Sequence, residues 1–297
     1  MLATVDFHRE RPFVQLDTVL LEQLGQHRSP RAVRLRSDQV AISRCGERLY
    51  FARGAKLLYS LFPFNCVRAW GLHTMLKDGE KGVILQRDRE TYGVAPHLPC
   101  GVVTPDILRR IAEVADKYGA TALKVTSAAR IAMLGIREED VDAVWTDLGI
   151  EPGSLVGICV RSIKACPGTT YCKRGQTDSL GVGLQLDKRY HGMQLPGKIK
   201  LGVSGCPNQC AETSFKDIGL VGTPKGWRIY VGGNGGAMPR MGEVLVQRID
   251  TETALELVDR ILDYYRENAK PRERIGRMID RLGLSAMEEA LGLGSDT

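Results

Sequence analysis

The chain has 297 residues, enough for two or three compact domains, and its composition is ordinary for a soluble globular protein, with 43% hydrophobic and 26% charged residues. Forty-one basic against 35 acidic residues give a formal charge of +6, which suits an anionic ligand. No basic block or aromatic-interleaved patch marks a nucleic-acid surface. No apolar run approaches the ~20 residues needed to span a bilayer, and the N-terminus lacks a secretory apolar segment, so we expect a cytoplasmic protein without membrane insertion.

Residues 1–80 carry the weakest signals and are interpreted as an N-terminal extension of unknown role. The pattern predicts an amphipathic helix over 16–24, strands over 31–35 and 40–43, and a helix over 48–59. Several arginines gather here, and a solvated surface accounts for them more simply than a docking surface does. Four cysteines without a close cysteine partner are interpreted as buried or incidental thiols: Cys45, Cys66, Cys100 and Cys159.

Residues 81–150 predict a small α+β unit. Thr104-Pro105-Asp106 opens a helix, with Thr104 as the N-cap, a proline in the first turn and an acid beside the positive helix end. A second helix is predicted over about 138–148, and strands over 81–87, 91–96, 122–126 and 130–136. Two helices against an antiparallel sheet form a ferredoxin-like layer.

Residues 151–297 predict a second α+β unit that ends in helices. Helices are predicted over about 174–190, 252–267 and 272–282, and strands over 198–204, 218–221, 227–231 and 243–249. The strand over 198–204 leads directly into a pair of cysteines.

Those cysteines, Cys206 and Cys210, follow an earlier pair, Cys166 and Cys172, so that the spacings are Cys-x5-Cys and Cys-x3-Cys. Four thiolates from two loops are what a cubane iron–sulfur cluster needs, one for each iron. Zinc knuckles usually hold two to four residues between ligands, and disulfides are disfavoured in the cytoplasm, but the residues alone leave both open. Pro207 suits the first turn of a helix, whose free N–H groups would face the cluster.

Several motifs around these cysteines carry a resemblance: Arg161-Ser-Ile-Lys164-Ala-Cys166, Gln176-Thr-Asp178-Ser179, Val203-Ser-Gly-Cys206-Pro-Asn208 and Gly226-Trp227-Arg-Ile-Tyr-Val-Gly-Gly-Asn234-Gly-Gly236. Together they resemble siroheme-dependent nitrite and sulfite reductases, above all the siroheme domain of the large NADH-dependent nitrite reductases. The resemblance spans about residues 81–283. It implies a single-copy, low-molecular-weight member with an α+β fold: a ferredoxin-like half-domain over 81–150, then a siroheme and [4Fe–4S] domain over 151–297.

The resemblance also implies the cofactors and the residues that hold them. The cluster ligands would be Cys166, Cys172, Cys206 and Cys210, and Cys210 would bridge the cluster to the siroheme iron. Siroheme is a polycarboxylate, so a buried one needs cations and backbone donors around it. The further residues assigned to the cofactors are Lys164, Thr169, Thr170, Asn208, Gly232, Gly233, Asn234, Gly235 and Arg240. On the residues alone, the glycine-rich loop 232–236 is more simply a tight turn.

Two arginines and a Lys-x-Lys pair bind the substrate anion in this family. Arg130 and Arg161 resemble the arginines, and Lys198 and Lys200 resemble the lysines. Alternation along a strand points both lysines to one face, although a solvated edge strand would show the same pattern. Ala129 and Ile131 flank Arg130 where many relatives have asparagine and glutamine, so this match is weaker than that of the cysteines.

These assignments predict a six-electron reductase of sulfite or nitrite that receives electrons from a separate donor, such as a ferredoxin or a partner redox subunit, because the sequence has no flavin or nicotinamide fingerprint. Larger reductases contain two copies of this unit. A symmetric homodimer would rebuild that arrangement, or the first eighty residues would close the site. The alternatives are an iron–sulfur enzyme like precorrin-3B synthase and a non-catalytic electron-transfer or zinc-structured subunit.

Overall fold

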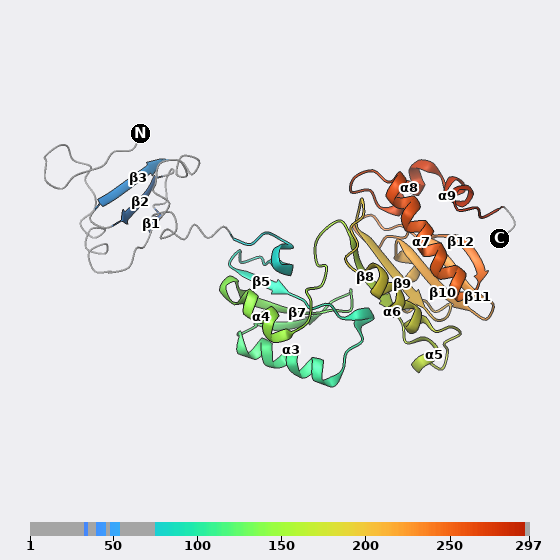
Figure 1. The fold of residues 1–297 in the computed structure, drawn as a ribbon, viewed down its shortest axis with the longest axis horizontal. Coiled ribbons are helices and arrows are strands. Elements are labelled where there is room, and N and C mark those ends of the chain that lie inside the picture. The colour runs from blue at the N-terminus through green and yellow to red at the C-terminus, as the bar shows by residue number, and fades with distance from the viewer. Residues whose placement is uncertain (1–32, 35–39, 46–47, 54–74, 295–297) are drawn as a thin grey trace. The chain divides into compact units, whose positions relative to one another are not determined.

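The computed structural model describes residues 33–34, 40–45, 48–53 and 75–294 (Figure 1). The chain divides into two units, residues 1–75 and 76–297. The described part of the second unit contains no helix long and apolar enough to cross a membrane.

The described residues of the first unit form a three-stranded antiparallel sheet in the order β1-β2-β3. Its strands are β1 (Val33–Arg34), β2 (Val40–Cys45) and β3 (Arg48–Arg53). The strands predicted over 31–35 and 40–43 are therefore present. The helix predicted over 48–59 is wrong at its start, because Leu49, Tyr50 and Phe51 favour a strand and pair with β2. The helix predicted over 16–24 lies outside the described residues.

The second unit begins with the predicted ferredoxin-like layer, in which an antiparallel sheet of order β4-β5-β7-β6 carries two helices. Its elements are β4 (Val83–Leu85), β5 (Thr91–Val94), α3 (Pro105–Lys117), β6 (Ala122–Val125), β7 (Ile131–Arg137) and α4 (Val141–Leu148), with short 3₁₀ turns at Glu80–Gly82, Pro99–Gly101 and Glu138–Asp140. Helix α3 begins where predicted, because the Thr104 side chain accepts a hydrogen bond from the Ile107 amide at 3.3 Å. Tyr92, Ile111 and Met133 lie in the core between the helices and the sheet.

The rest of the unit is built on a mixed five-stranded sheet of order β12-β11-β10-β9-β8, in which β8, β9 and β10 are parallel neighbours. Its elements are β8 (Val160–Ala165), α5 (Gly168–Tyr171), α6 (Ser179–Tyr190), β9 (Ile199–Ser204), a 3₁₀ turn (Thr213–Phe215), β10 (Ile218–Thr223), β11 (Gly226–Val231), β12 (Glu243–Ile249), α7 (Thr251–Asn268), α8 (Ile275–Leu282) and α9 (Leu284–Ala290). Figure 1 shows α6 and α7 lying over the sheet, where Leu186, Ile199, Val258 and Ile261 share one core.

Four features of this domain differ from the sequence-based predictions. Strand β8 and helix α9 were not predicted. Helix α6 starts at Ser179 and not near 174, because the Asp178 carboxylate accepts a hydrogen bond from the Gly181 amide at 2.9 Å and caps the helix there. No helix begins at Pro207, where the chain forms turns instead. The short helix beside the cysteines is α5, within the first loop.

Replacing Asp250 with alanine should lower the free energy of unfolding by about 1 kcal/mol. The Asp250 carboxylate caps α7 by accepting a hydrogen bond from the Thr253 amide at 2.9 Å. Chemical denaturation of both proteins measures this difference. Asp263→Ala, which removes an exposed carboxylate on the same helix, is the matched control and should change stability by much less. Equal effects of the two substitutions would contradict the capping role.

Candidate functional site

The two cysteine loops leave neighbouring parallel strands at the same edge of the sheet. Cys166 directly follows β8, and its amide donates a hydrogen bond to the carbonyl of Val203 in β9 at 3.0 Å. Cys206 comes two residues after β9 ends. Because β8 and β9 run parallel, their carboxyl ends bring both loops to one place. The parallel arrangement of β8 and β9 thus brings together two pairs of cysteines that lie far apart in the sequence.

Gly205 joins the two loops through its backbone. Its amide donates to the Cys166 sulfur at 3.1 Å, and its carbonyl accepts from the Gln176 amide at 2.7 Å. A Cβ atom on Gly205 would lie 2.9 Å from the Gly168 Cα, so only glycine allows this approach. The loops therefore form one continuous surface around the cysteines.

The four loop cysteines are free thiols, and their surroundings suit a metal cluster. Cys206 is 9% exposed, whereas Cys210 is exposed. The Cys166 sulfur lies 3.2 Å from the Ser179 hydroxyl and accepts from the Gly205 amide, and such an N–H donor stabilises a thiolate. Four unpaired thiols in two adjoining loops, with a backbone N–H donor at Cys166, fit the donor set of an iron–sulfur cluster.

The second cysteine loop packs against the face of the sheet opposite α6 and α7. Gly202 in β9 permits this contact, because a Cβ atom there would lie 2.8 Å from the Lys216 side chain. Gln209 holds the loop's shape: its backbone has φ 50°, and its side-chain oxygen accepts from Thr213 Oγ1 at 2.7 Å and from the Ser214 amide at 2.9 Å. The sequence analysis missed this role, because nothing in the local pattern marks Gln209 apart from its place between two cysteines.

The structure brings the two predicted arginines together. Arg130 is 5% exposed, and its guanidinium donates a hydrogen bond to the Arg161 carbonyl. Burial, and then the charge of Arg161, lower the pKa of Arg130. The Arg161 Nε atom is buried and has no hydrogen-bond partner among the described residues. A partly buried cation with an unused, buried donor atom fits an anionic ligand or an anionic cofactor group.

The predicted lysines lie on either side of the buried Ile199, as strand alternation requires. Burial, followed by neighbouring cations, lowers the pKa of both Lys198 and Lys200. The charge of Arg161 contributes at each lysine, so all three side chains lie within electrostatic reach of one another. The solvated edge strand is excluded, since β9 is an interior strand and both lysines are partly buried.

Arg274, a residue that the sequence analysis missed, also belongs to this basic cluster. Its charge lowers the pKa of both lysines and of Arg161. Arg274 forms a two-pronged ion pair with the fully buried Asp217, at 2.6 and 2.7 Å, and donates to the Asn234 side chain at 3.1 Å. Asp217 therefore offsets part of the positive charge gathered here. Arg274 lies in the closing helical region, where no cysteine motif draws attention to it.

The glycine-rich loop reaches the basic cluster through Asn234, but Arg240 is engaged within its own chain. The backbones of Asn234 and Arg240 exchange two hydrogen bonds of 2.8 Å. The Arg240 guanidinium donates to the Gly232 carbonyl at 3.1 Å and to Asp280 at 3.0 Å, and also contacts Glu243. These contacts agree with the simpler interpretation of the loop 232–236 as a tight turn. The assignment of this loop to a cofactor stays a prediction.

The remaining predicted cofactor residues line the cysteine loops. Lys164 pairs with Glu212 at 3.2 Å, and Thr170 donates to Asp178 at 3.3 Å. Thr169 and Asn208 are exposed. Their roles toward a cofactor stay predictions as well.

Comparison with known proteins places this architecture in a family. The family model described as the nitrite and sulphite reductase 4Fe-4S domain matches residues 156–295, and the nitrite/sulfite reductase ferredoxin-like half domain matches residues 84–149. The chain is 41% identical over 216 residues to a protein of Nitratidesulfovibrio vulgaris named "Sulfite reductase, assimilatory-type", covering 73% of this chain and 99% of the relative. This chain belongs to the nitrite and sulphite reductase family.

The chain also resembles part of a longer nitrite reductase and shares its fold with a sulfite reductase of low sequence identity. The chain is 41% identical over 207 residues to the nitrite reductase [NAD(P)H] of Bacillus subtilis, but this covers 70% of the chain and 26% of that much longer protein. The crystal structure of dissimilatory sulfite reductase I shares the fold, with a TM-score of 0.63 at 18% identity, over 69% of this chain and 70% of that one.

Membership of this family confirms three predictions made from the sequence. The fold is a ferredoxin-like half-domain followed by a reductase domain, the protein is an oxidoreductase, and its cofactors are siroheme and a [4Fe–4S] cluster, the pair that reductases of this family use. The individual residues assigned to these cofactors stay predictions.

Replacing Gly205 with alanine should lower the iron and acid-labile sulfide content, because the added methyl group forces the two cysteine loops apart. Iron and sulfide analysis of the purified variant measures this loss. Gly294→Ala is the matched control, since a Cβ atom there meets nothing within 4 Å. Full cluster content in Gly205→Ala would show that close contact between the loops is not required.

Proposed function

We propose that this protein is a six-electron reductase of a small oxyanion, converting sulfite to sulfide or nitrite to ammonia. The observation that carries the proposal is the gathering of Arg130, Lys198 and Lys200 around Arg161, at the strands β8 and β9 from which the cysteine loops leave. An electron carrier would have no need for several partly buried cations whose charge Asp217 and Asp187 offset only in part. Near-full-length similarity to an assimilatory-type sulfite reductase makes sulfite the first substrate to test.

The cysteine loops would hold the cofactors. Cys166, Cys172, Cys206 and Cys210 would bind the cluster, and the Cys210 thiolate, which is exposed, would be shared with the siroheme iron. When bound, the cluster would pass on electrons received from the donor, and the siroheme would supply the iron at which the oxyanion is reduced. Lys164, Asn234 and the unused donor of Arg161 would face anionic groups of the cofactor or of the substrate.

The basic side chains would bind the substrate and supply protons. Fixed cations raise the local concentration of an anion and stabilise the charge that develops on a leaving oxygen. Their positions are set before substrate arrives, because β9 and the Arg130 contact hold them in the protein framework. Since burial and neighbouring cations lower the pKa of Lys200, its Nζ atom releases a proton more readily than that of an exposed lysine.

A separate protein would deliver the electrons, and a second copy of the chain would complete the assembly. The ferredoxin-like sheet supports the dimer through its edge strand β6, all four of whose residues are exposed. Leu123 and Val125 on this strand are 46% and 68% exposed. Among the described residues β6 pairs with β7 alone, and a strand edge of this kind with apolar side chains favours pairing. Sedimentation analysis of the purified protein distinguishes monomer from dimer.

The experiment that tests the proposed function combines a spectrum with turnover. The holoenzyme should show the Soret and far-red bands of siroheme. With reduced methyl viologen as the electron donor, it should produce sulfide from sulfite or ammonium from nitrite. Comparing kcat/KM for the two anions identifies the substrate. A protein that carries both cofactors and reduces neither anion would overturn the proposal.

Replacing Lys200 with methionine should lower turnover about 10²-fold, the usual scale for removing one fixed electrostatic stabiliser. Both cofactors should remain, because lysine ligates neither metal, and the visible spectrum reports this directly. Lys225→Met, which removes an exposed lysine in the turn between β10 and β11, is the matched control. Wild-type kinetics in Lys200→Met would remove this residue from the anion site.

The same lysines should make anion binding fail at alkaline pH. The ammonium form is lost as pH rises through the lysine pKa, which lies below the ordinary value of 10.5 for both Lys198 and Lys200. KM should therefore rise at a lower pH than an exposed lysine would give. In Lys200→Met, KM should already be high near neutral pH and should rise less as the pH increases.

A further inference from the structure

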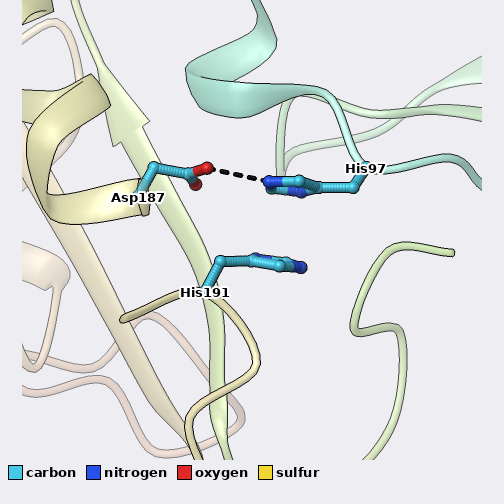
Figure 2. Close-up of side chains that lie close together, drawn as sticks. All are labelled: His97, Asp187 and His191. Atoms are coloured by element: carbon cyan, nitrogen blue, oxygen red, sulfur yellow. Dashed lines mark hydrogen bonds and ion pairs between the residues drawn. The ribbon is translucent and has the colours of Figure 1, made fainter. Parts of the chain in front are cut away.

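A cluster of three side chains lies apart from the cysteine loops, where the ferredoxin-like half-domain meets the reductase domain. His97 comes from the segment between β5 and the Pro99–Gly101 turn, whereas Asp187 and His191 lie at the end of α6 (Figure 2). His191 is four positions after Asp187, and the His191 amide donates to the Asp187 carbonyl at 3.0 Å, so the two side chains share one helix face. The cluster therefore joins two structural layers.

The side-chain atoms of this cluster are close enough to share one ion. His97 Nε2 lies 2.8 Å from Asp187 Oδ2, and one ligand atom from each of the three residues lies within 4.8 Å of the others. Figure 2 shows the His97 and His191 rings stacked, with centroids 3.5 Å apart and a 17° angle between their planes. Among the described residues, no other group of histidine, cysteine and carboxylate side chains meets this spacing.

His191 has a nitrogen available for a ligand. Its Nε2 lies 3.3 Å from the Ser154 hydroxyl, and its Nδ1 is buried without a hydrogen-bond partner among the described residues. A histidine that binds a metal through one nitrogen commonly donates from the other to an oxygen, which fixes the tautomer. Burial, followed by the neighbouring His97, lowers the pKa of His191 to about 4, so the ring is neutral near pH 7.

From this geometry we propose that His97, Asp187 and His191 bind a divalent transition metal ion, with zinc as the best match. Two imidazoles and a carboxylate suit Zn²⁺, and three protein ligands leave a fourth tetrahedral position for water. The unpartnered Nδ1 of His191 is the independent observation that points to a ligand. This site uses none of the cysteines or basic residues assigned to the reductase function.

Metal binding requires a small rearrangement of the rings. Tetrahedral ligands at bond lengths of about 2.0–2.1 Å stand roughly 3.4 Å apart, so the contact between His97 and Asp187 opens slightly. The lone pair of each imidazole lies in its ring plane, and stacked rings do not point at one ion. Rotation of His191 about the Cβ–Cγ bond turns Nδ1 toward the ion, and this torsion has a broad energy minimum.

The charges around the cluster are compatible with a cation. Arg130 contributes to the low pKa of His191, so it is the cationic group whose repulsion opposes the metal. Asp187 is buried and carries the negative charge that faces both Arg130 and the ion. The buried thiol of Cys100 also faces Asp187, and burial raises its pKa to about 12, so it stays protonated. Because its ligands come from two layers, the metal would stabilise the junction between them.

Zinc binding to the holoenzyme tests this proposal directly. After treatment with EDTA and equilibration with zinc chloride, we expect about one more zinc per wild-type chain than per chain of His191→Gln, with equal iron in both. His97→Gln should show the same loss as His191→Gln. Ser154→Ala should retain the three ligands and bind zinc at least 10-fold more weakly, since it removes only the partner of His191. Elemental analysis and a zinc titration provide these values.

Thermal unfolding supplies an independent measurement. The midpoint should rise with zinc concentration in the wild type and in Asp263→Asn, a control that removes an exposed carboxylate on α7, but not in His191→Gln. Equal zinc uptake by wild type and His191→Gln, or no uptake by the wild type, would overturn the proposal. Neither result bears on the reductase activity, because the cysteine loops and basic residues are unchanged in these variants.

Discussion

The close backbone contact between the two cysteine loops is the constraint on which the rest of the site depends. Strands β8 and β9 end side by side, and Gly205 lets the loops that follow them approach within backbone contact. The sheet brings the two loops next to each other, and the lack of a side chain at Gly205 allows their backbones to come into contact. Helix α6 follows the first loop and packs over the same strands. The elements β8, β9 and α6 therefore hold the cysteine loops and also form part of the hydrophobic core.

Gathering positive charge in a partly buried place is costly, and the protein offsets only part of that cost. The buried Asp217 holds Arg274 in a two-pronged ion pair, while Arg161 keeps an unused donor. Burial, and then the repulsion that remains, lower the pKa values of Arg130, Lys198 and Lys200. Such residual positive charge is useful where an anion must bind, because the ligand itself completes the neutralisation.

The junction between the two layers of the second unit contributes to both candidate sites. Arg130 crosses it to contact the Arg161 carbonyl, and His97 crosses it to reach Asp187. Backbone hydrogen bonds reinforce these contacts, with the Gly153 amide donating to the Ala95 carbonyl at 2.9 Å. The half-domain therefore acts as more than a support for the cysteine loops. A change in how it packs would move a basic side chain of the reductase site and a ligand of the proposed metal site together.

The sequence by itself determined the cysteine loops, the order of most helices and strands, and the lysine pair, because spacing and periodicity are local properties that a linear pattern records. Only the tertiary structure decided what joins them. Arg274 and the cluster of His97, Asp187 and His191 act through partners far away in the chain, so no local pattern marks them. The missing helix at Pro207 has a more local origin: contacts of Gln209 with Thr213 and Ser214 shape that loop and override the preference of proline for a helix start.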